Sequence, residues 1–126
     1  MAFIEYNPHP EGLETGDCVI RALAKALGQE WERIYMALTV KGLQMAMWGD
    51  TNAVWEAYLR EQGFLREAIP NTGPDCYTIA DFAADHPEGT FIVATGSHVV
   101  AVQDGSYYDS WDSGSRVPSY YFYKGD

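Results

Sequence analysis

The chain has 126 residues, of which 47% are hydrophobic and 14% aromatic, and it carries a formal net charge of −10 at pH 7. This length and composition predict one folded domain over residues 1–126 and exclude a disordered chain. The acidic balance and the absence of a Lys/Arg cluster disfavour nucleic acid and acidic membranes as partners, because both carry negative charge.

The beginning of the sequence bears on where the protein works. Residues 1–17 lack the basic segment and apolar core of a secretory signal peptide, and the chain lacks the run of about 18 apolar residues that a membrane helix needs. We therefore expect a cytoplasmic protein with reduced thiols. Its two cysteines, Cys18 and Cys76, are too few for a Cys-rich zinc site, and a disulfide between them is the less expected state in a reducing compartment.

In chain order, an irregular arm precedes a central helix. Pro8, Pro10 and Gly12 predict that residues 1–14 form no regular structure. The range 17–27 is apolar on most sides, which predicts a buried helix, and the glycine that follows suits a C-terminal cap.

Three further helices are predicted before the pattern changes. The range 30–41 has apolar residues at i, i+3, i+4 and i+7 and is expected to stop at Gly42, and the range 52–62 has one apolar face. A short helix begins at Thr78, whose spacing to Asp81 resembles a capping box.

The remaining part of the chain predicts strands. The apolar and aromatic segments have the length of strands at 90–95, 98–103, 106–111 and 119–124. Asp104-Gly105 between two of them is a strong signal for a two-residue hairpin turn. Helices that precede an antiparallel sheet indicate an α+β fold.

Cys18 is the candidate nucleophile. It lies in the first turn of the first predicted helix, two residues after Gly16. The unpaired N–H groups and the helix dipole there favour an anion and lower the pKa of a thiol, although the carboxylate of Asp17 opposes a thiolate. The position is equally compatible with a small buried side chain.

His98, which opens an apolar strand, is the candidate base. With Asp104-Gly105 as the loop, His98 pairs with Trp111 and becomes a diagonal neighbour of Asp109 on the same face, about 7–8 Å away at Cα. A carboxylate there would hold the imidazole tautomer and stabilise its cation. A three-residue loop would instead bring Asp112 beside the ring.

Cys18, His98 and Asp109 thus supply a nucleophile, a base and an orienting acid. Amide or ester chemistry by a thiol needs this set, because a thiol at neutral pH is mostly protonated without a nearby base. A small metal site made of His98, Asp109 and Asp112 is the weaker alternative, since no clustered histidine motif accompanies it. No cofactor is expected.

Three segments also carry a resemblance to a known family. TGDCVIRALAKALG (15–28), HPEGTFIV (86–93) and SHVVAVQDGSYYDSWDSGSRV (97–117) resemble small papain-like cysteine peptidase-fold proteins from bacteria and their phages. The resemblance covers about residues 5–118. It implies a papain-like fold in which Cys18 matches the nucleophile, His98 the base and Asp109 the orienting residue.

The chain departs from the papain pattern at one position. Papain-type enzymes usually have a Gln, which donates into the oxyanion hole, where this chain has Gly12. The backbone N–H of Cys18 remains as one donor, and a second is expected from Asn7 or Thr15, of which Asn7 has the better donor group.

The resulting expectation is a cysteine hydrolase that cleaves an amide, peptide or isopeptide bond of a peptide or protein through a Cys–His–Asp triad. The alternative is a catalytically inactive papain-fold module that binds a partner.

Overall fold

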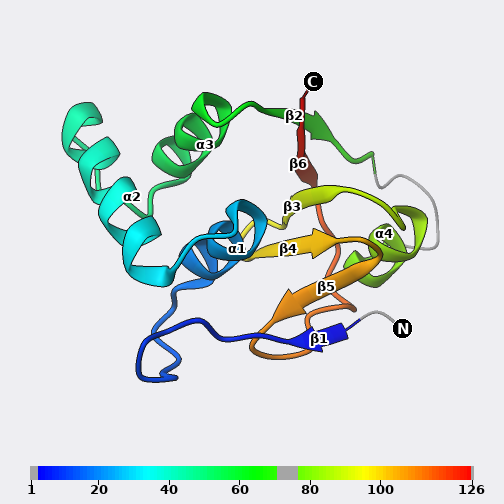
Figure 1. The fold of residues 1–126 in the computed structure, drawn as a ribbon. Helices are drawn as coiled ribbons and strands as arrows, with labels where there is room; N and C mark the ends of the chain where they lie inside the picture. The colour runs from blue at the N-terminus through cyan, green and yellow to red at the C-terminus, as the bar shows by residue number, and fades with distance from the viewer. Residues whose placement is uncertain (1–2, 71–76, 126) are drawn as a thin grey trace.

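The apolar segments between residues 90 and 124 form the centre of a six-stranded sheet. The computed structural model describes residues 3–70 and 77–125, and its strand order is β1-β5-β4-β3-β6-β2 (Figure 1). The strands are β1 (Phe3–Glu5), β2 (Phe64–Ala68), β3 (Thr90–Ala94), β4 (Val99–Gln103), β5 (Ser106–Asp109) and β6 (Tyr120–Lys124). Because β1 runs parallel to β5 while the other neighbours are antiparallel, the sheet is mixed, and the prediction of an antiparallel sheet is wrong.

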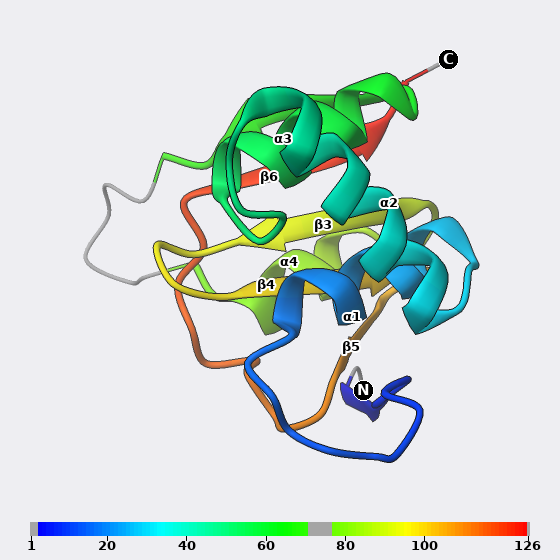
Figure 2. The same ribbon diagram turned by 90° about the vertical axis from the view of Figure 1, so that its left-hand side faces the viewer.

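The helices cover both faces of the sheet (Figure 1 and Figure 2). They are α1 (Cys18–Leu27), α2 (Trp31–Met45), α3 (Asn52–Glu61) and α4 (Ile79–Asp85). Side chains alternate between the two faces along a strand, so in β3 Ile92 packs with α1, α2 and α3, whereas Val93 packs with α4. This double burial explains why the central strands are almost wholly apolar, and it confirms the α+β class.

Two local predictions that rest on turn and cap chemistry are confirmed. In the hairpin between β4 and β5, Gln103 lies opposite Ser106, and Asp104 and Gly105 have the positive φ angles of 51° and 87° that a two-residue turn requires. At the start of α4 the backbone N–H of Asp81 donates to the Thr78 hydroxyl, and the Thr78 N–H donates to the Asp81 carboxylate.

The predicted end of α2 at Gly42 is wrong, because the helix continues to Met45. Gly42 is a packing residue and not a stop. A Cβ atom at this position would lie 2.5 Å from the carbonyl oxygen of Met47 and 3.1 Å from the nitrogen of Gly49. The loop after α2 therefore folds back closely against the helix at this glycine. Ala46 ends the helix in the left-handed conformation.

Two edge strands were not predicted. β1 lies in the arm expected to be irregular, and its neighbour in the sheet is β5, to which it pairs in parallel, for example with Phe3 opposite Tyr107. β2 has one buried residue, Phe64, and pairs only with β6. Neither segment carries the alternating pattern of a half-buried strand, because tertiary pairing and not local sequence specifies both. Among the described residues, no helix has the length and apolar character needed to cross a membrane.

We expect Gly42→Ala to destabilise the protein by about 1–3 kcal/mol, as overpacking usually does. Alanine is favoured over glycine inside a helix by about 1 kcal/mol, but the methyl group would meet a backbone carbonyl that cannot move without displacing the loop. Urea denaturation measures the change. Gly96→Ala is the control, since a Cβ there meets no heavy atom within 4 Å. A more stable Gly42→Ala protein would contradict this interpretation.

Candidate active site

Cys18 is the first residue of α1 and a half-buried free thiol. The helix begins here because Gly16, with φ of 71°, turns the chain, and because the apolar side chains that follow pack against β4. Asp17 occupies the N-cap position, yet its carboxylate makes no capping hydrogen bond. The first-turn N–H groups of α1 are therefore without a side-chain cap beside the thiol.

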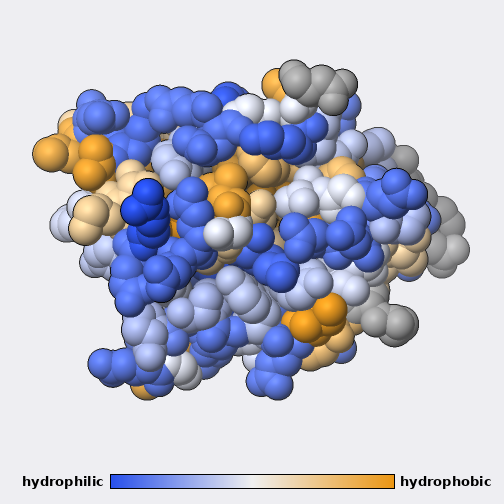
Figure 3. All heavy atoms as spheres, viewed as in Figure 1, coloured by the Kyte–Doolittle hydropathy of each residue, from blue (hydrophilic) through white to orange (hydrophobic). Residues whose placement is uncertain are grey.

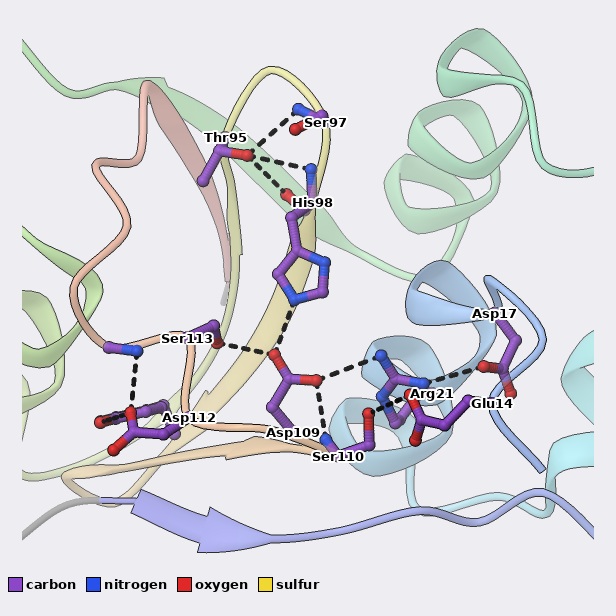
Figure 4. A network of polar contacts seen from close by, with 12 residues as sticks. Glu14, Asp17, Arg21, Thr95, Ser97, His98, Asp109, Ser110, Asp112 and Ser113 are labelled. Carbon is purple, nitrogen blue, oxygen red and sulfur yellow. Dashed lines mark hydrogen bonds and ion pairs between the residues drawn. The ribbon is translucent and has the colours of Figure 1, made fainter. Parts of the chain in front are cut away.

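His98 and Asp109 meet at the end of the β4–β5 hairpin, as the two-residue loop predicts. The paired register of the hairpin ends with Ala101 opposite Tyr108, and beyond it the rings of His98 and Trp111 lie side by side. His98 Nε2 lies 2.6 Å from Asp109 Oδ2 (Figure 4). The ring centroids of His98 and Trp111 are 4.9 Å apart. The His98 backbone is held by the Thr95 hydroxyl, which accepts from its N–H at 2.9 Å.

The His98 ring also contacts Cys18. The ring and the backbone of Val99 lie close enough to the sulfur to favour its ionised form and lower the pKa of the thiol. Because Nε2 is engaged by Asp109, Nδ1 is the ring nitrogen left for the sulfur. The imidazole therefore binds the carboxylate through Nε2 and has Nδ1 available for the thiol.

These contacts shift the pKa values in the direction that an ion pair requires. Burial alone would lower the pKa of His98, but its bonds to Asp109 and Cys18 raise it to about 9. Burial alone would raise the pKa of the Cys18 thiol, but the hydrogen bonds from His98 and Val99, with the charges of His98 and Arg21, bring it below its usual value. At neutral pH both shifts favour a thiolate beside an imidazolium.

The orienting carboxylate has more partners than the sequence predicted. Asp109 is 1% exposed. Its Oδ2 accepts from His98 and from the Ser113 hydroxyl at 2.6 Å, and its Oδ1 accepts from the Ser110 N–H at 2.7 Å and lies 3.1 Å from Arg21 Nη2 (Figure 4). Burial raises the pKa of Asp109, but His98 and Ser113 hold it below its usual range.

Arg21 is the site residue that the sequence interpretation missed. It lies on α1, is almost fully buried, and bridges Asp109 to Asp17, whose Oδ1 is 2.8 Å from Nη1. The second oxygen of Asp17 accepts from the indole N–H of Trp31 at 2.7 Å. Asp17 is thus paired with a cation. A charged residue inside the apolar run CVIRALAKAL was the available signal, since a buried arginine needs anionic partners.

The other sequence candidates lie elsewhere. Asp112, the alternative orienting residue, accepts from the Tyr107 hydroxyl and the Gly114 N–H, not from His98. The Asn7 amide donates to the Leu13 carbonyl at 3.3 Å, and its oxygen accepts from the His9 N–H.

None of the hydrogen bonds found in residues 3–70 and 77–125 joins Asn7 or Thr15 to Cys18, and the second oxyanion donor stays a prediction. Cys76 lies outside the described residues.

A groove of about 870 Å³ lies near the N-terminus of α1. It is lined by Gly16, Asp17 and Val19 on either side of Cys18, and by residues of α2 and the loop that follows it. Several of these are exposed apolar or aromatic side chains: Tyr35, Leu43, Met47 and Trp48. Figure 3 shows hydrophobic atoms at the surface on the side where Figure 1 places α2. Neither this groove nor a hollow of about 810 Å³ on α2 and α3 is lined by Cys18, His98 or Asp109.

The described residues hold no cluster of three His, Cys, Asp or Glu side chains suited to a metal ion. The metal alternative required Asp112 to converge with His98 and Asp109, and the Tyr107 contact directs it elsewhere. Comparison of the chain with protein-family models, curated proteins and solved structures gives no match. Any functional conclusion therefore depends on the geometry of the site.

We expect Asp109→Asn to lower the pKa of His98 from about 9 by about one unit or more, because the neutral amide no longer stabilises the imidazolium. NMR titration of the His98 ring measures this. The folded pKa exceeds the ordinary value of about 6.5, so the protonated ring stabilises the fold below pH 6.5 and this contribution is lost as the pH rises through 9. The stability advantage of the wild type over Asp109→Asn should shrink across that window.

Asp112→Asn is the matched control, because its carboxylate is bonded to Tyr107. An equal change in the His98 pKa in both variants would show that nearby negative charge in general, and not the contact with Asp109, sets that pKa.

Proposed function

We propose that the chain is a papain-like cysteine hydrolase that cleaves an amide, peptide or isopeptide bond of a peptide or protein substrate in the cytoplasm. The observation that carries the proposal is the His98 imidazole held between Cys18 and Asp109, at the N-terminus of a helix. The layout of a helix-borne thiol, followed along the chain by a histidine and a carboxylate on a sheet, is also that of papain-like enzymes.

In the first half of the proposed reaction the Cys18 thiolate attacks the carbonyl carbon. A C–S bond forms, and the carbonyl oxygen becomes an oxyanion for which the uncapped N–H of Cys18 is one donor. The tetrahedral intermediate then collapses and the C–N bond breaks. The His98 imidazolium gives its Nδ1 proton to the leaving amine, and a thioester remains on Cys18.

In the second half, water hydrolyses the thioester. Neutral His98 takes a proton from the water as it attacks the acyl carbon, the C–S bond breaks, and the acid is released while the ion pair with Cys18 forms again. Asp109 remains ionised throughout, since His98 and Ser113 keep its pKa below the usual range. Its role is to orient the ring and stabilise the imidazolium.

The groove beside Cys18 supports a peptide or protein as substrate. It borders the residues on either side of the thiol and extends over exposed apolar side chains of α2 and the following loop. An extended chain laid along it would pass the N-terminus of α1, the helix that begins at Cys18. Sites of this kind bind mostly through apolar contact with a few polar groups.

Cys18→Ala should abolish both acylation and cleavage. With p-nitrophenyl acetate as the probe, the wild type should release nitrophenolate in a burst and carry one acetyl group on Cys18, seen by mass spectrometry after acid quench. On any peptide cleaved from a mixed peptide-amide library, kcat/KM should fall by about a thousandfold or more in Cys18→Ala.

Cys76→Ala is the control for general thiol reactivity, since it removes the other cysteine of the chain. Cleavage that survives in Cys18→Ala would exclude this nucleophile. A wild type that binds peptides from the library but is neither acylated nor able to cleave them would favour the inactive binding module.

A further inference from the structure

A buried arginine joins the helix that carries Cys18 to the carboxylate that orients His98. The side chain of Arg21 is 5% exposed, with Nη1 2.8 Å from Asp17 and Nη2 3.1 Å from Asp109. Arg21 lies three residues after Cys18, so the two side chains lie one turn apart on neighbouring sides of α1. Figure 4 shows the guanidinium between the two carboxylates.

Stability alone does not account for this arrangement. Asp17, Arg21 and Asp109 are all buried, and a buried ion group of this kind is often no more stabilising than apolar side chains of the same volume. The informative feature is the position of Asp109 in this ion group. Asp109 is the residue whose other oxygen holds His98, so the ion group ends at the candidate active site.

We propose that Arg21 is a positioning residue of the active site, which fixes the Asp109 carboxylate so that one oxygen faces His98 and which ties that carboxylate to the helix bearing Cys18. This inference rests on the proposed function for its meaning in catalysis. Its physical content, the coupling of α1 to the His98–Asp109 pair, can be measured without a substrate.

The distribution of donors around Asp109 supports this role. Ser110 and Ser113 come from the chain that directly follows β5, and His98 comes from the turn before β4. Of the polar contacts to Asp109 found in the described part of the chain, Arg21 supplies the one from α1. Arg21 is therefore the polar link from the helix that bears Cys18 to the carboxylate that orients His98.

The charged groups facing this unit alternate in sign. Arg21 lies between the carboxylates of Asp17 and Asp109, and Asp109 faces both Arg21 and His98. Asp112, although bonded to Tyr107, lies close enough to Asp109 for the two carboxylates to repel each other weakly.

A guanidinium suits the position better than an ammonium. Arginine presents donors in a planar fork and can bond two carboxylates at once, whereas lysine is a compact point charge on a flexible stem. Arg21→Lys therefore keeps the charge and removes the fork. Arg21→Met combined with Asp17→Asn removes the cation and one anion together, which leaves the net charge of the site unchanged.

The experiment compares these two proteins with the wild type. The readouts are the pKa of His98 by NMR, the rate of Cys18 alkylation by iodoacetamide against pH, and thermal melting. In each folded variant the pKa of His98 should fall by about one unit or more, and alkylation at about pH 6 should slow about tenfold, because a freed Asp109 holds the imidazolium less well. Lys25→Met, a charge loss on the same helix, should match the wild type.

A rise in the pKa of His98, where a fall is expected, would overturn the proposal. If Arg21 acted only as a counter-charge, its removal would leave the full charge of Asp109 to His98, and the pKa of His98 would rise in the double variant. An unchanged His98 pKa in folded Arg21→Lys would likewise exclude a positioning role. If neither variant folds, Arg21 is a stability residue and the proposal fails.

Failure of this inference is separable from failure of the hydrolase proposal. A protein that hydrolyses nothing, yet shows the expected His98 shifts, would keep Arg21 as a positioning residue and lose the proposed reaction. A protein that cleaves peptides, with alkylation unaffected by Arg21→Lys, would keep the reaction and lose the positioning role.

Discussion

The buried carboxylate of Asp109 is the group on which the site depends. An ionised carboxylate removed from water is costly unless several donors surround it. Here the donors come from three separate places: α1, the turn before β4, and the segment after β5. α1, β4 and the segment after β5 must therefore all be folded together before the Asp109 carboxylate has its hydrogen-bond partners. The same arrangement places His98 near Cys18.

The electrostatic pattern follows from that carboxylate. From Asp17 through Arg21, Asp109 and His98 to Cys18, each charge lies next to one of opposite sign when the thiol is ionised. In such a series each member stabilises the ionised form of its neighbours, which is why the pKa of His98 rises while that of Cys18 falls. The adjacent Asp17 does not suppress the thiolate, because Arg21 stands beside it.

The parts of the fold that the sequence predicted are those governed by local rules. Asp104-Gly105 specifies one turn type, and that turn sets the register that brings His98 to Asp109. Periodicity located the helices, and a capping pair located the start of α4. What was missed depends on partners far along the chain. Pairing with β5 makes β1 a strand, and the loop folded against Gly42 explains a glycine that local rules would assign to a helix end.

The role of Arg21 could not be read in the same way, because an arginine in a helix is ordinarily a solvent-exposed residue. Its partner Asp109 lies on a strand at the other end of the sequence, and only the packing of α1 on β4 brings the two together. The sequence indicated an anomaly, a charge inside an apolar run, without indicating what neutralises it. The candidate triad could be predicted because a hairpin directly connects two of its members, His98 and Asp109.

The hydrogen-bond partners of the Asp17 carboxylate connect the stability of α1 with the proposed reaction. A capping aspartate would contribute about 1 kcal/mol to the helix by accepting from its first N–H groups, but here the carboxylate binds Arg21 and Trp31 instead. Asp17 therefore makes no capping bond to the first N–H groups of α1, next to the thiol. In the proposed reaction an oxyanion forms at that place. Because Asp17 makes no capping bond, it leaves these N–H groups available as oxyanion donors. Its carboxylate instead binds Arg21, the residue proposed to position Asp109.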